Sequence, residues 1–371
     1  MKKTMCSIIL LFIFCSFSQY PLFAQTIETE VNFAAHKHIS GYTFKKMKHP
    51  EIFQGNKKEK NYFEGWYFKM VSANGSSIMS IIPGISLSEN GQEQHAFIQI
   101  IDGVTAQTSY YSFPIEEFSF SKNEFAVRIG ENYFSKNRVV LNIKTDSSSI
   151  SGEVQLNNLV ELPSRRALNA GIMGWYRFMP FMECYHGVVS LNHELTGTLV
   201  KDGKENNFDN GLGYIEKDWG SSMPSAWIWM QSNHFSKSNS SFMLSIADVP
   251  FIGKSFTGFL GFFLHDSVIY RFATYTHAKL TLEEATLNET KITIKDRKNT
   301  YQILAVRNKV GLLKAPVKGA MDRRIPESID AKISLTVMDR KGNIVFCDST
   351  SIAGLELVGD QEKLLRSLKK K

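Results

Sequence analysis

Apolar and polar residues alternate with a period of two along most of this chain, the pattern of strands with one buried face. Aromatic residues make up 12% of the sequence, including 27 Phe, which favours strands over helices. Helical periodicity is confined to residues 166–180 and the C-terminal tail. The clearest alternating runs are 77–87, 95–101, 194–200, 332–338 and 343–349.

Dipeptides that favour tight turns separate these runs. They are Asn-Gly at 74–75 and 90–91, Asp-Gly at 202–203 and Lys-Gly at 341–342. Asn-Gly and Asp-Gly supply the pair of positive φ angles that a type I′ hairpin needs. We therefore predict an all-β fold of two antiparallel meanders with few short helices. Each meander is expected to close as a barrel or to form paired sheets, because closure removes exposed edges.

The order of segments predicts an exported protein with two β-domains. Residues 1–24 have the basic start, short apolar stretch and small-residue cleavage site, at Ala24, of a signal peptide. We therefore expect the mature protein in the periplasm or outside the cell. The predicted segments after it are a lead-in, 25–44, two domains, 45–202 and 203–360, and a basic tail, 361–371.

Charge and cysteine content exclude several classes of function. The formal net charge is +7, and no basic stripe is interleaved with aromatic residues, so we expect no nucleic-acid partner. The basic run 363–371 is either a solvated helix end or a peripheral contact with anionic lipid head groups. We predict Cys184 and Cys347 to be small buried residues, with one disulfide bond as the alternative that export permits.

One carboxylate interrupts an apolar strand face at residues 61–70. Alternation puts Glu64 in line with Trp66, Phe68 and Met70. An ionised carboxylate without a partner in apolar surroundings is costly, so its pKa rises and it becomes protonated. Glu64 is therefore either a general acid or half of a structural pair with Arg or Lys.

The segment 213–235 holds three of the five Trp residues of the chain. Two indoles are followed there by two amides and a phenyl ring, which suits a pocket that holds an apolar ligand by a polar head. Upstream, we expect Glu216, Asp218 and Trp219 in a turn, with surface ion pairs to Lys217 as the structural alternative. On the strand face in question lie Trp227, Trp229, Gln231, Asn233 and Phe235.

The histidines give little sign of metal binding. His186 and His193 are seven residues apart and face opposite ways on one strand, so we expect no metal site. His95 is either a hydrogen-bonded structural residue or a base. Motifs for nucleotide binding, serine hydrolases and zinc proteases are missing from the sequence, and we expect no cofactor.

Four stretches of the sequence are distinctive: YFEGWYFK (62–69), EKDWGSSMPSAWIWMQSN (216–233), RRIPESIDAKISLTV (323–337) and AGLELVG (353–359). They resemble the tocopherol cyclase family, which is related to carotenoid hydratase and AttH-like proteins. The resemblance extends from about residue 45 to residue 359. It implies two lipocalin-like β-barrel domains and a hydrophobic substrate with an aromatic head and a prenyl tail. It also implies a cofactor-free reaction that closes a prenylated hydroquinone to a chromanol.

The implied reaction assigns roles to the candidate residues. Ring closure needs a proton delivered to an alkene and capture of the resulting cation by a phenol oxygen, with water excluded. Glu64 is the first candidate for the acid, with Glu216 and Asp218 as alternatives. Gln231 and Asn233 would hold the oxygens of the head group. The other predicted substrate contacts are Trp66, Tyr67, Tyr185, His95, Trp219, Trp227 and Trp229.

Two other functions fit the same sequence. A carrier of lipids or isoprenoids would need only the apolar cavity, and its Glu64 would be ion-paired. A glycan-binding or glycan-cleaving protein would need an open groove with two carboxylates about 5–10 Å apart. The enzyme, in contrast, needs a buried acid without an ion-pair partner at the cavity.

Overall fold

The computed structural model describes residues 33–35, 42, 45–46, 49–163, 171–179, 182–251 and 254–369. The chain divides into two units, Met1–Asn32 and Phe33–Lys371, and every described residue belongs to the second. The predicted signal peptide therefore lies outside the described residues. In the described part of the chain, no helix is long and apolar enough to cross a membrane.

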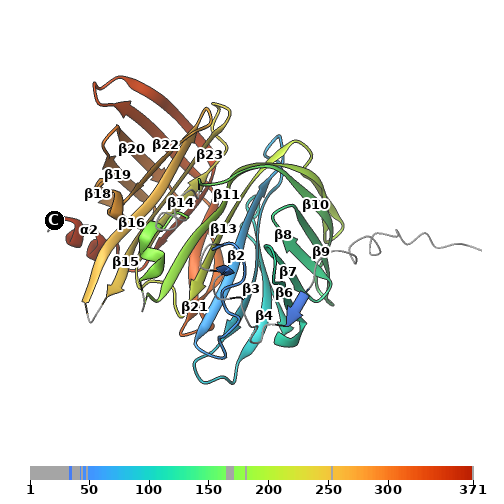
Figure 1. The fold of residues 1–371 in the computed structure, drawn as a ribbon. Coiled ribbons are helices and arrows are strands. Elements are labelled where there is room, and N and C mark those ends of the chain that lie inside the picture. Colours follow the sequence, from blue (N-terminus) through green and yellow to red (C-terminus); the bar gives the residue numbers. More distant parts are fainter. Residues whose placement is uncertain are drawn as a thin grey trace, which may run out of the picture. The chain divides into compact units, whose positions relative to one another are not determined.

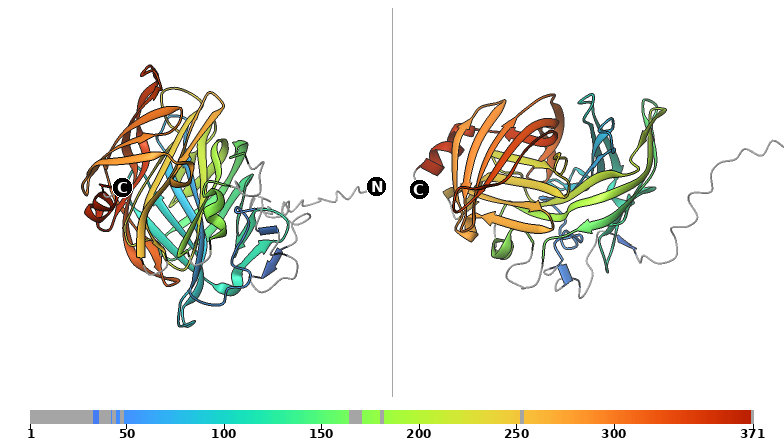
Figure 2. Two further views of the ribbon diagram at one scale, coloured as in Figure 1. Left: turned by 60° about the vertical axis from the view of Figure 1, so that its left-hand side comes forward. Right: turned by 90° about the horizontal axis from the view of Figure 1, so that it is seen from above.

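The described strands of the second unit form two antiparallel sheets, which lie side by side in Figures 1 and 2. The first sheet has 13 strands within the described residues. Its strands are β1 (Phe33–Ala35), β2 (Tyr62–Val71), β3 (Ile78–Leu87), β4 (Gln94–Asp102), β5 (Thr108–Pro114), β6 (Phe118–Ser121), β7 (Ala126–Ile129), β8 (Asn132–Ser135), β9 (Arg138–Lys144), β10 (Ser149–Val160), β11 (Cys184–Lys201), β12 (Lys204–Asn207) and β13 (Gly211–Gly220).

The second sheet has 10 strands among the described residues. It starts at β14, after the last strand of the first sheet, so the chain passes once from one sheet to the other at residues 220–227. The predicted boundary at 202/203 stays a prediction. The strands are β14 (Trp227–Ser232), β15 (Ser240–Phe251), β16 (Lys254–His265), β17 (Val268–Ala273), β18 (Lys279–Ala285), β19 (Glu289–Lys295), β20 (Asn299–Val306), β21 (Gly311–Val317), β22 (Ala320–Asp339) and β23 (Ile344–Val358).

The predicted all-β class with two antiparallel sheets is confirmed, whereas closed barrels are not found among the described strands. The first sheet runs from β1 to β5 and the second from β17 to β18, so each ends in two different edge strands. Closure would need hydrogen bonds between those edges. Short helices complete the described part: η1 (Ile115–Glu117), η3 (Gly174–Phe178), η4 (Thr274–Thr276) and α2 (Gln361–Lys369).

Turn chemistry explains the hairpins, with one refinement. Asp202 and Gly203 both have positive φ angles, of 51° and 78°, as a type I′ turn requires. At the other predicted turns only the glycine has a positive φ, with 69° at Gly75 and 86° at Gly342. The expectation of paired positive angles at the Asn-Gly turns is therefore wrong, although all four turns connect antiparallel strands.

Alternation along the strands divides the apolar residues among three cores. On β2, Trp66 and Phe68 belong to the core of the first sheet, whereas Tyr67 faces the second sheet. On β14, Ile228 belongs to the core of the second sheet and Trp229 to the core between the sheets. The predicted faces of both segments are thereby confirmed as far as each strand extends. The third core brings aromatic residues of both sheets together.

The C-terminal helix and the cysteines differ from the simplest expectations. Leu364 of α2 is fully buried in the core of the second sheet, so one face of the tail is packed.

Cys184 and Cys347 are both free. Cys184 is half-buried and Cys347 is exposed, so the prediction that both are buried is wrong for Cys347. Phe235 follows the end of β14 at Ser232 and therefore packs in the second core, not on the predicted face.

Candidate functional site

A cavity of about 210 Å³ lies between the two sheets. Strands β2, β4, β11 and β13 of the first sheet and β14, β16, β22 and β23 of the second contribute to its wall. Most of the lining is apolar and aromatic. Its polar exceptions include five carboxyl side chains, one of them Glu183, and one histidine. The other four carboxyl groups and the histidine carry the chemistry of the site: His186, Glu216, Asp218, Glu327 and Glu356.

Strand register places the polar groups in rows. In the first sheet, Glu216 of β13 is directly opposite Tyr67 of β2, and Asp218 is directly opposite His186 of β11. Residues in such pairs point to the same face, here toward the second sheet. The sequence predicted a turn around Glu216 and Asp218. That prediction is wrong, because these residues lie within β13, where alternation turns both carboxylates to the cavity.

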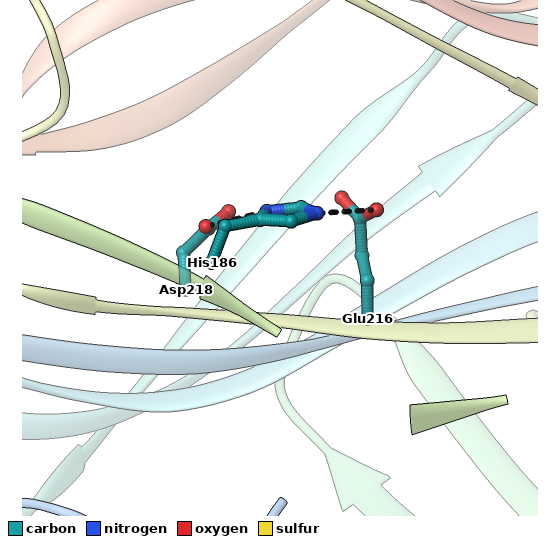
Figure 3. A group of neighbouring side chains, drawn as sticks. All are labelled: His186, Glu216 and Asp218. Atoms are coloured by element: carbon teal, nitrogen blue, oxygen red, sulfur yellow. Dashed lines mark hydrogen bonds and ion pairs between the residues drawn. The ribbon is translucent and has the colours of Figure 1, made fainter. Parts of the chain in front are cut away.

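His186 lies between two carboxylates, as Figure 3 shows. Its Nδ1 is 2.9 Å from Oδ1 of Asp218, and its Nε2 is 3.5 Å from Oε2 of Glu216. Burial lowers the pKa of His186, but the charges of Asp218 and Glu216 outweigh burial and raise it to about 9. His186 is therefore an imidazolium at neutral pH, with its Nε2–H directed at Glu216.

Glu216 is a buried acid whose two oxygens have different surroundings. Oε2 accepts hydrogen bonds from the Tyr214 hydroxyl at 2.7 Å and from Trp229 Nε1 at 3.1 Å. In the described part of the chain, Oε1 accepts no hydrogen bond. Burial raises the pKa of Glu216 to about 7, and the charge of His186 opposes this shift. At neutral pH, Glu216 is thus partly protonated.

Reciprocal hydrogen bonds connect the two walls of the cavity. Trp229, from the second sheet, donates to Glu216 of the first, and Tyr67, from the first sheet, donates to Oε1 of Glu327 at 2.7 Å. The rings of Tyr67 and Trp229 meet edge to face at 5.4 Å. Burial raises the pKa of Glu327 to about 7. The cavity therefore has a weakly acidic carboxyl group on each wall.

The cluster around His186 could also hold a divalent cation. One ligand atom each from His186, Glu216 and Asp218 lie within 4.8 Å of one another. One nitrogen and two carboxylate oxygens are suitable donors for zinc or manganese. A metal would have to displace the proton of the imidazolium, whose raised pKa opposes coordination.

Glu64 has the ion-paired arrangement, one of the two that the sequence left open. It is fully buried, and Oε1 is 2.5 Å from Nζ of Lys217. The backbone N–H groups of Gln54 and Gly55 and the hydroxyl of Tyr62 also donate to its carboxylate. Alternation turns Lys217 away from the cavity that Glu216 and Asp218 face. Glu64 therefore lies in the core of the first sheet, outside the cavity lining.

Four other predicted contact residues also lie outside the cavity lining. Trp66 donates to the carbonyl oxygen of Glu51 and stacks in the core of the first sheet. Trp219 stacks on Tyr185 with ring centroids 5.6 Å apart. His95 Nε2 is 2.6 Å from the hydroxyl of Tyr110, the hydrogen-bonded arrangement that the sequence allowed.

The two amides of the predicted head-group site have protein partners. Gln231 accepts a hydrogen bond from the buried Lys69, with Nζ and Oε1 3.2 Å apart. Asn233 donates to the side chain of Asn192 and to the carbonyl oxygen of Gly213. Both amides satisfy polar groups of the other sheet and lie outside the cavity lining. Of the predicted residues, the cavity contains Tyr67, Glu216, Asp218, Trp227 and Trp229.

Sequence reasoning missed three residues of the site. The sequence suggests His186 only as a possible zinc ligand. Its carboxylate partners could not be identified there, because they follow from the register of β11 and β13. Glu327 and Glu356 lie in two of the stretches quoted for the family resemblance. Glu356 stands between two leucines, so it carries the same signal as Glu64, a lone carboxylate in an apolar run. Applying that test throughout the chain would have identified it.

Comparison with known proteins assigns the family. Residues 119–359 match the family model described as tocopherol cyclase-like. The chain belongs to the tocopherol cyclase-like family. The matched range contains six of the strands named above as contributing to the cavity wall, β11, β13, β14, β16, β22 and β23, together with His186 and the four carboxyl groups that carry the chemistry of the site.

Individual relatives match shorter parts of this member of the tocopherol cyclase-like family. A probable chloroplastic tocopherol cyclase of Oryza sativa subsp. japonica is 34% identical over 74 residues, which is 20% of this chain and 16% of the rice protein. The chloroplastic tocopherol cyclase of Zea mays is 36% identical over 62 residues, 17% of this chain and 13% of the maize protein. The matches thus span less than a fifth of either plant enzyme.

A solved structure shares the fold. The crystal structure of CghA with Sch210972 superposes with a TM-score of 0.51 at 10% identity, and the alignment covers 82% of this chain and 90% of CghA. At this identity the likeness concerns the arrangement of the strands alone.

Proposed function

We propose that this protein catalyses the acid-promoted addition of an oxygen nucleophile to a double bond of an isoprenoid, by cyclisation or hydration and without a cofactor. One observation carries the proposal: Glu216, a buried carboxyl group with a pKa raised to about 7, lines an aromatic and apolar cavity. Family membership and the names of the plant relatives, both tocopherol cyclases, support the same chemistry. A prenylated hydroquinone is the substrate class that fits these names.

Glu216 is the proposed proton donor, in preference to Glu64. Protonating an alkene requires an acid that is protonated in an appreciable fraction of the molecules near pH 7 and that reaches the cavity, and Glu216 meets both conditions. Oε2 of Glu216 accepts hydrogen bonds from Tyr214 and Trp229 and is the oxygen that faces Nε2 of His186, where the proton would be returned. The neutral carboxyl group then delivers its proton to the substrate in the cavity. Glu64 has its counter-ion, Lys217, and is separated from the cavity.

The imidazolium of His186 would restore the proton to Glu216. Asp218 fixes the ring through Nδ1 and stabilises its positive charge, so that Nε2–H faces Glu216. Asp218 and His186 both line the cavity and are only partly buried, so solvent protons can recharge the ring. In this arrangement Asp218 positions His186 and does not itself meet the substrate.

The aromatic wall would protect the cation that protonation creates. The faces of Tyr67, Trp227 and Trp229 can each stabilise a nearby cation by about 0.5–2 kcal/mol when water is excluded. Arg323 lies over Trp227, with its guanidinium carbon 4.9 Å from the ring centroid, and donates to two backbone carbonyl groups of the β13–β14 connection. These contacts fix one wall of the cavity.

Turnover of a defined substrate tests the proposed function. The purified protein is incubated anaerobically with a prenylated hydroquinone, and the product is identified by chromatography and mass spectrometry. We expect an isomer of the substrate if cyclisation occurs, or the substrate plus water if hydration occurs. Binding without any product would replace the enzyme by the carrier that the sequence also allows. An open groove for glycans has no support in the mostly apolar lining.

Export and membrane contact remain proposals from the sequence. We propose that the protein acts in the periplasm or outside the cell, where a substrate with a prenyl tail would come from a membrane. The basic residues after Leu364 would then lie near anionic lipid head groups.

A further inference from the structure

A second pair of acids lies on the opposite wall from Glu216. Glu327 of β22 and Glu356 of β23 are directly opposite each other in the register of the second sheet, and Trp229 of β14 is opposite Glu356 on its other side. Like charges at directly opposite positions are unfavourable, all the more in an apolar wall. Glu327 is fully buried and Glu356 half-buried, and both line the cavity.

One carboxylate oxygen of this pair accepts no hydrogen bond from the described residues. The hydroxyl of Tyr67 donates to Oε1 of Glu327, and Nε1 of Trp227 donates to Oε2 of Glu356. Among the described residues, Oε2 of Glu327 is buried and accepts no hydrogen bond. Because Glu356 is directly opposite, one proton held by the pair would reduce both the repulsion between the carboxylates and the cost of burying this oxygen.

A structural role alone does not explain two acids at this position. The contact that joins the sheets, from Tyr67 to Glu327, needs a single acceptor, which an amide would supply without a charge. The second carboxyl group adds repulsion and gives no further contact between the sheets. A pair with one proton, however, still has carboxylate lone pairs toward the cavity, which can accept a hydrogen bond from a hydroxyl group.

We propose that the Glu327–Glu356 pair binds the hydroxyl group of the substrate and accepts its proton when the oxygen captures the cation. The inference rests on the proposed function and deepens it. It assigns the nucleophile to the substrate itself, as a phenol or other hydroxyl, so the reaction is a cyclisation and not a hydration. Glu216 and the pair then act as donor and acceptor on opposite walls of one cavity.

The proposed step conserves atoms and electrons. The O–H bond of Glu216 breaks, and the π electrons of the alkene form a C–H bond to its proton, which leaves a tertiary cation. A lone pair of the hydroxyl oxygen forms the C–O bond, and its proton passes to the carboxylate of the pair. The pair then releases this proton to solvent, and Glu216 recovers one through His186. The substrate is isomerised and neither oxidised nor reduced.

Binding of two matched probes tests this inference without turnover. The probes are geranylhydroquinone, kept reduced, and its dimethyl ether, which has the same ring and prenyl tail but a methyl group in place of each hydroxyl proton. Trp227 and Trp229 line the cavity, so tryptophan fluorescence reports binding. For the full chain we expect the hydroquinone to bind about tenfold more tightly than the ether, the value of one charge-assisted hydrogen bond.

Four variants separate the roles. Glu327→Gln and Glu356→Gln should each remove most of the tenfold preference while the affinity for the ether stays unchanged. Glu216→Gln should keep the preference, because Glu216 faces the alkene. Glu205→Gln, an exposed substitution on β12, is the control for handling of the protein. Circular dichroism of each variant confirms that it is folded.

The results distinguish failure of this inference from failure of the proposed function. If both variants of the pair retain the preference, or the wild-type protein shows none, the inference is overturned even when the protein turns over the hydroquinone. If the wild-type protein binds neither probe, the proposed function fails and the inference fails with it. Loss of the preference in both variants, with the ether still bound, supports the assignment.

Discussion

Replacing Glu64 by Gln separates the structural role of this carboxylate from a catalytic one. The change removes the negative charge from a site where Lys217 is fully buried and within 2.5 Å of the carboxylate. Removing one partner of a buried ion pair costs about 3–5 kcal/mol, because the remaining charge is left without compensation. Three backbone and hydroxyl donors around Glu64 also lose a charged acceptor.

The expected result is a large loss of stability. At about 2–4 °C for each kcal/mol, the melting temperature of Glu64→Gln should fall by roughly 6–20 °C. Burial already lowers the pKa of Lys217 to about 8, against the opposing charge of Glu64. Because its pKa is lower in the folded state than in the unfolded state, burying the charged Lys217 destabilises the protein at low pH. This cost is relieved as pH rises toward about 10.4, the pKa of an unperturbed lysine. The defect of the variant should therefore shrink between pH 7 and pH 9.

Thermal unfolding followed by circular dichroism at both pH values is the assay. The double variant Glu64→Gln/Lys217→Met removes the whole pair and should recover most of the lost stability. Below the melting temperature, Glu64→Gln should retain turnover per folded molecule. A melting temperature within 1 °C of the wild type at pH 7, or complete loss of turnover in a folded variant, would refute the structural interpretation.

Three further predictions concern Glu216 and its neighbour His186. Turnover should decrease as pH rises through about 7, because Glu216 must be protonated, and a pH–rate profile checks this. The contribution of His186 to stability should decrease as pH rises from 7 to 9, because its raised pKa stabilises the folded state only while the ring is protonated. The difference in melting temperature between the wild type and His186→Gln across this pH range measures that contribution. Trp229→Phe removes a hydrogen bond that lowers the pKa of Glu216, so the alkaline limb of the profile should move up by about half to one pH unit. An unmoved limb in Trp229→Phe would show that Glu216 does not control the rate.

Much of the fold follows from local pattern. Alternation and turn dipeptides specify the strands, because one buried face and a positive φ leave few other conformations. Trp227 and Trp229 could be placed on one face for the same reason. The extent of each face could not be predicted, because β14 ends at Ser232 for reasons that lie outside the segment.

The features of the site that the sequence did not predict depend on contacts between residues far apart in the sequence. Whether Glu64 is paired is decided by Lys217, which alternation on β13 directs into the first core. Gln231 meets Lys69 only because the two sheets pack face to face. The pairing of Glu327 with Glu356 follows from the register of β22 and β23. Composition and local spacing contain no information on these pairs.

The central claim is that Glu216 delivers the proton. The most direct measurement is turnover of a prenylated hydroquinone in deuterated water by the wild-type protein and by Glu216→Gln, with mass spectrometry of the product. For the wild type we predict a ring-closed product with deuterium on the carbon adjacent to the one that bonds to oxygen. For Glu216→Gln we predict a rate at least about a hundredfold lower, with the substrate still bound. Wild-type turnover rates in Glu216→Gln, or a product without deuterium, would contradict it.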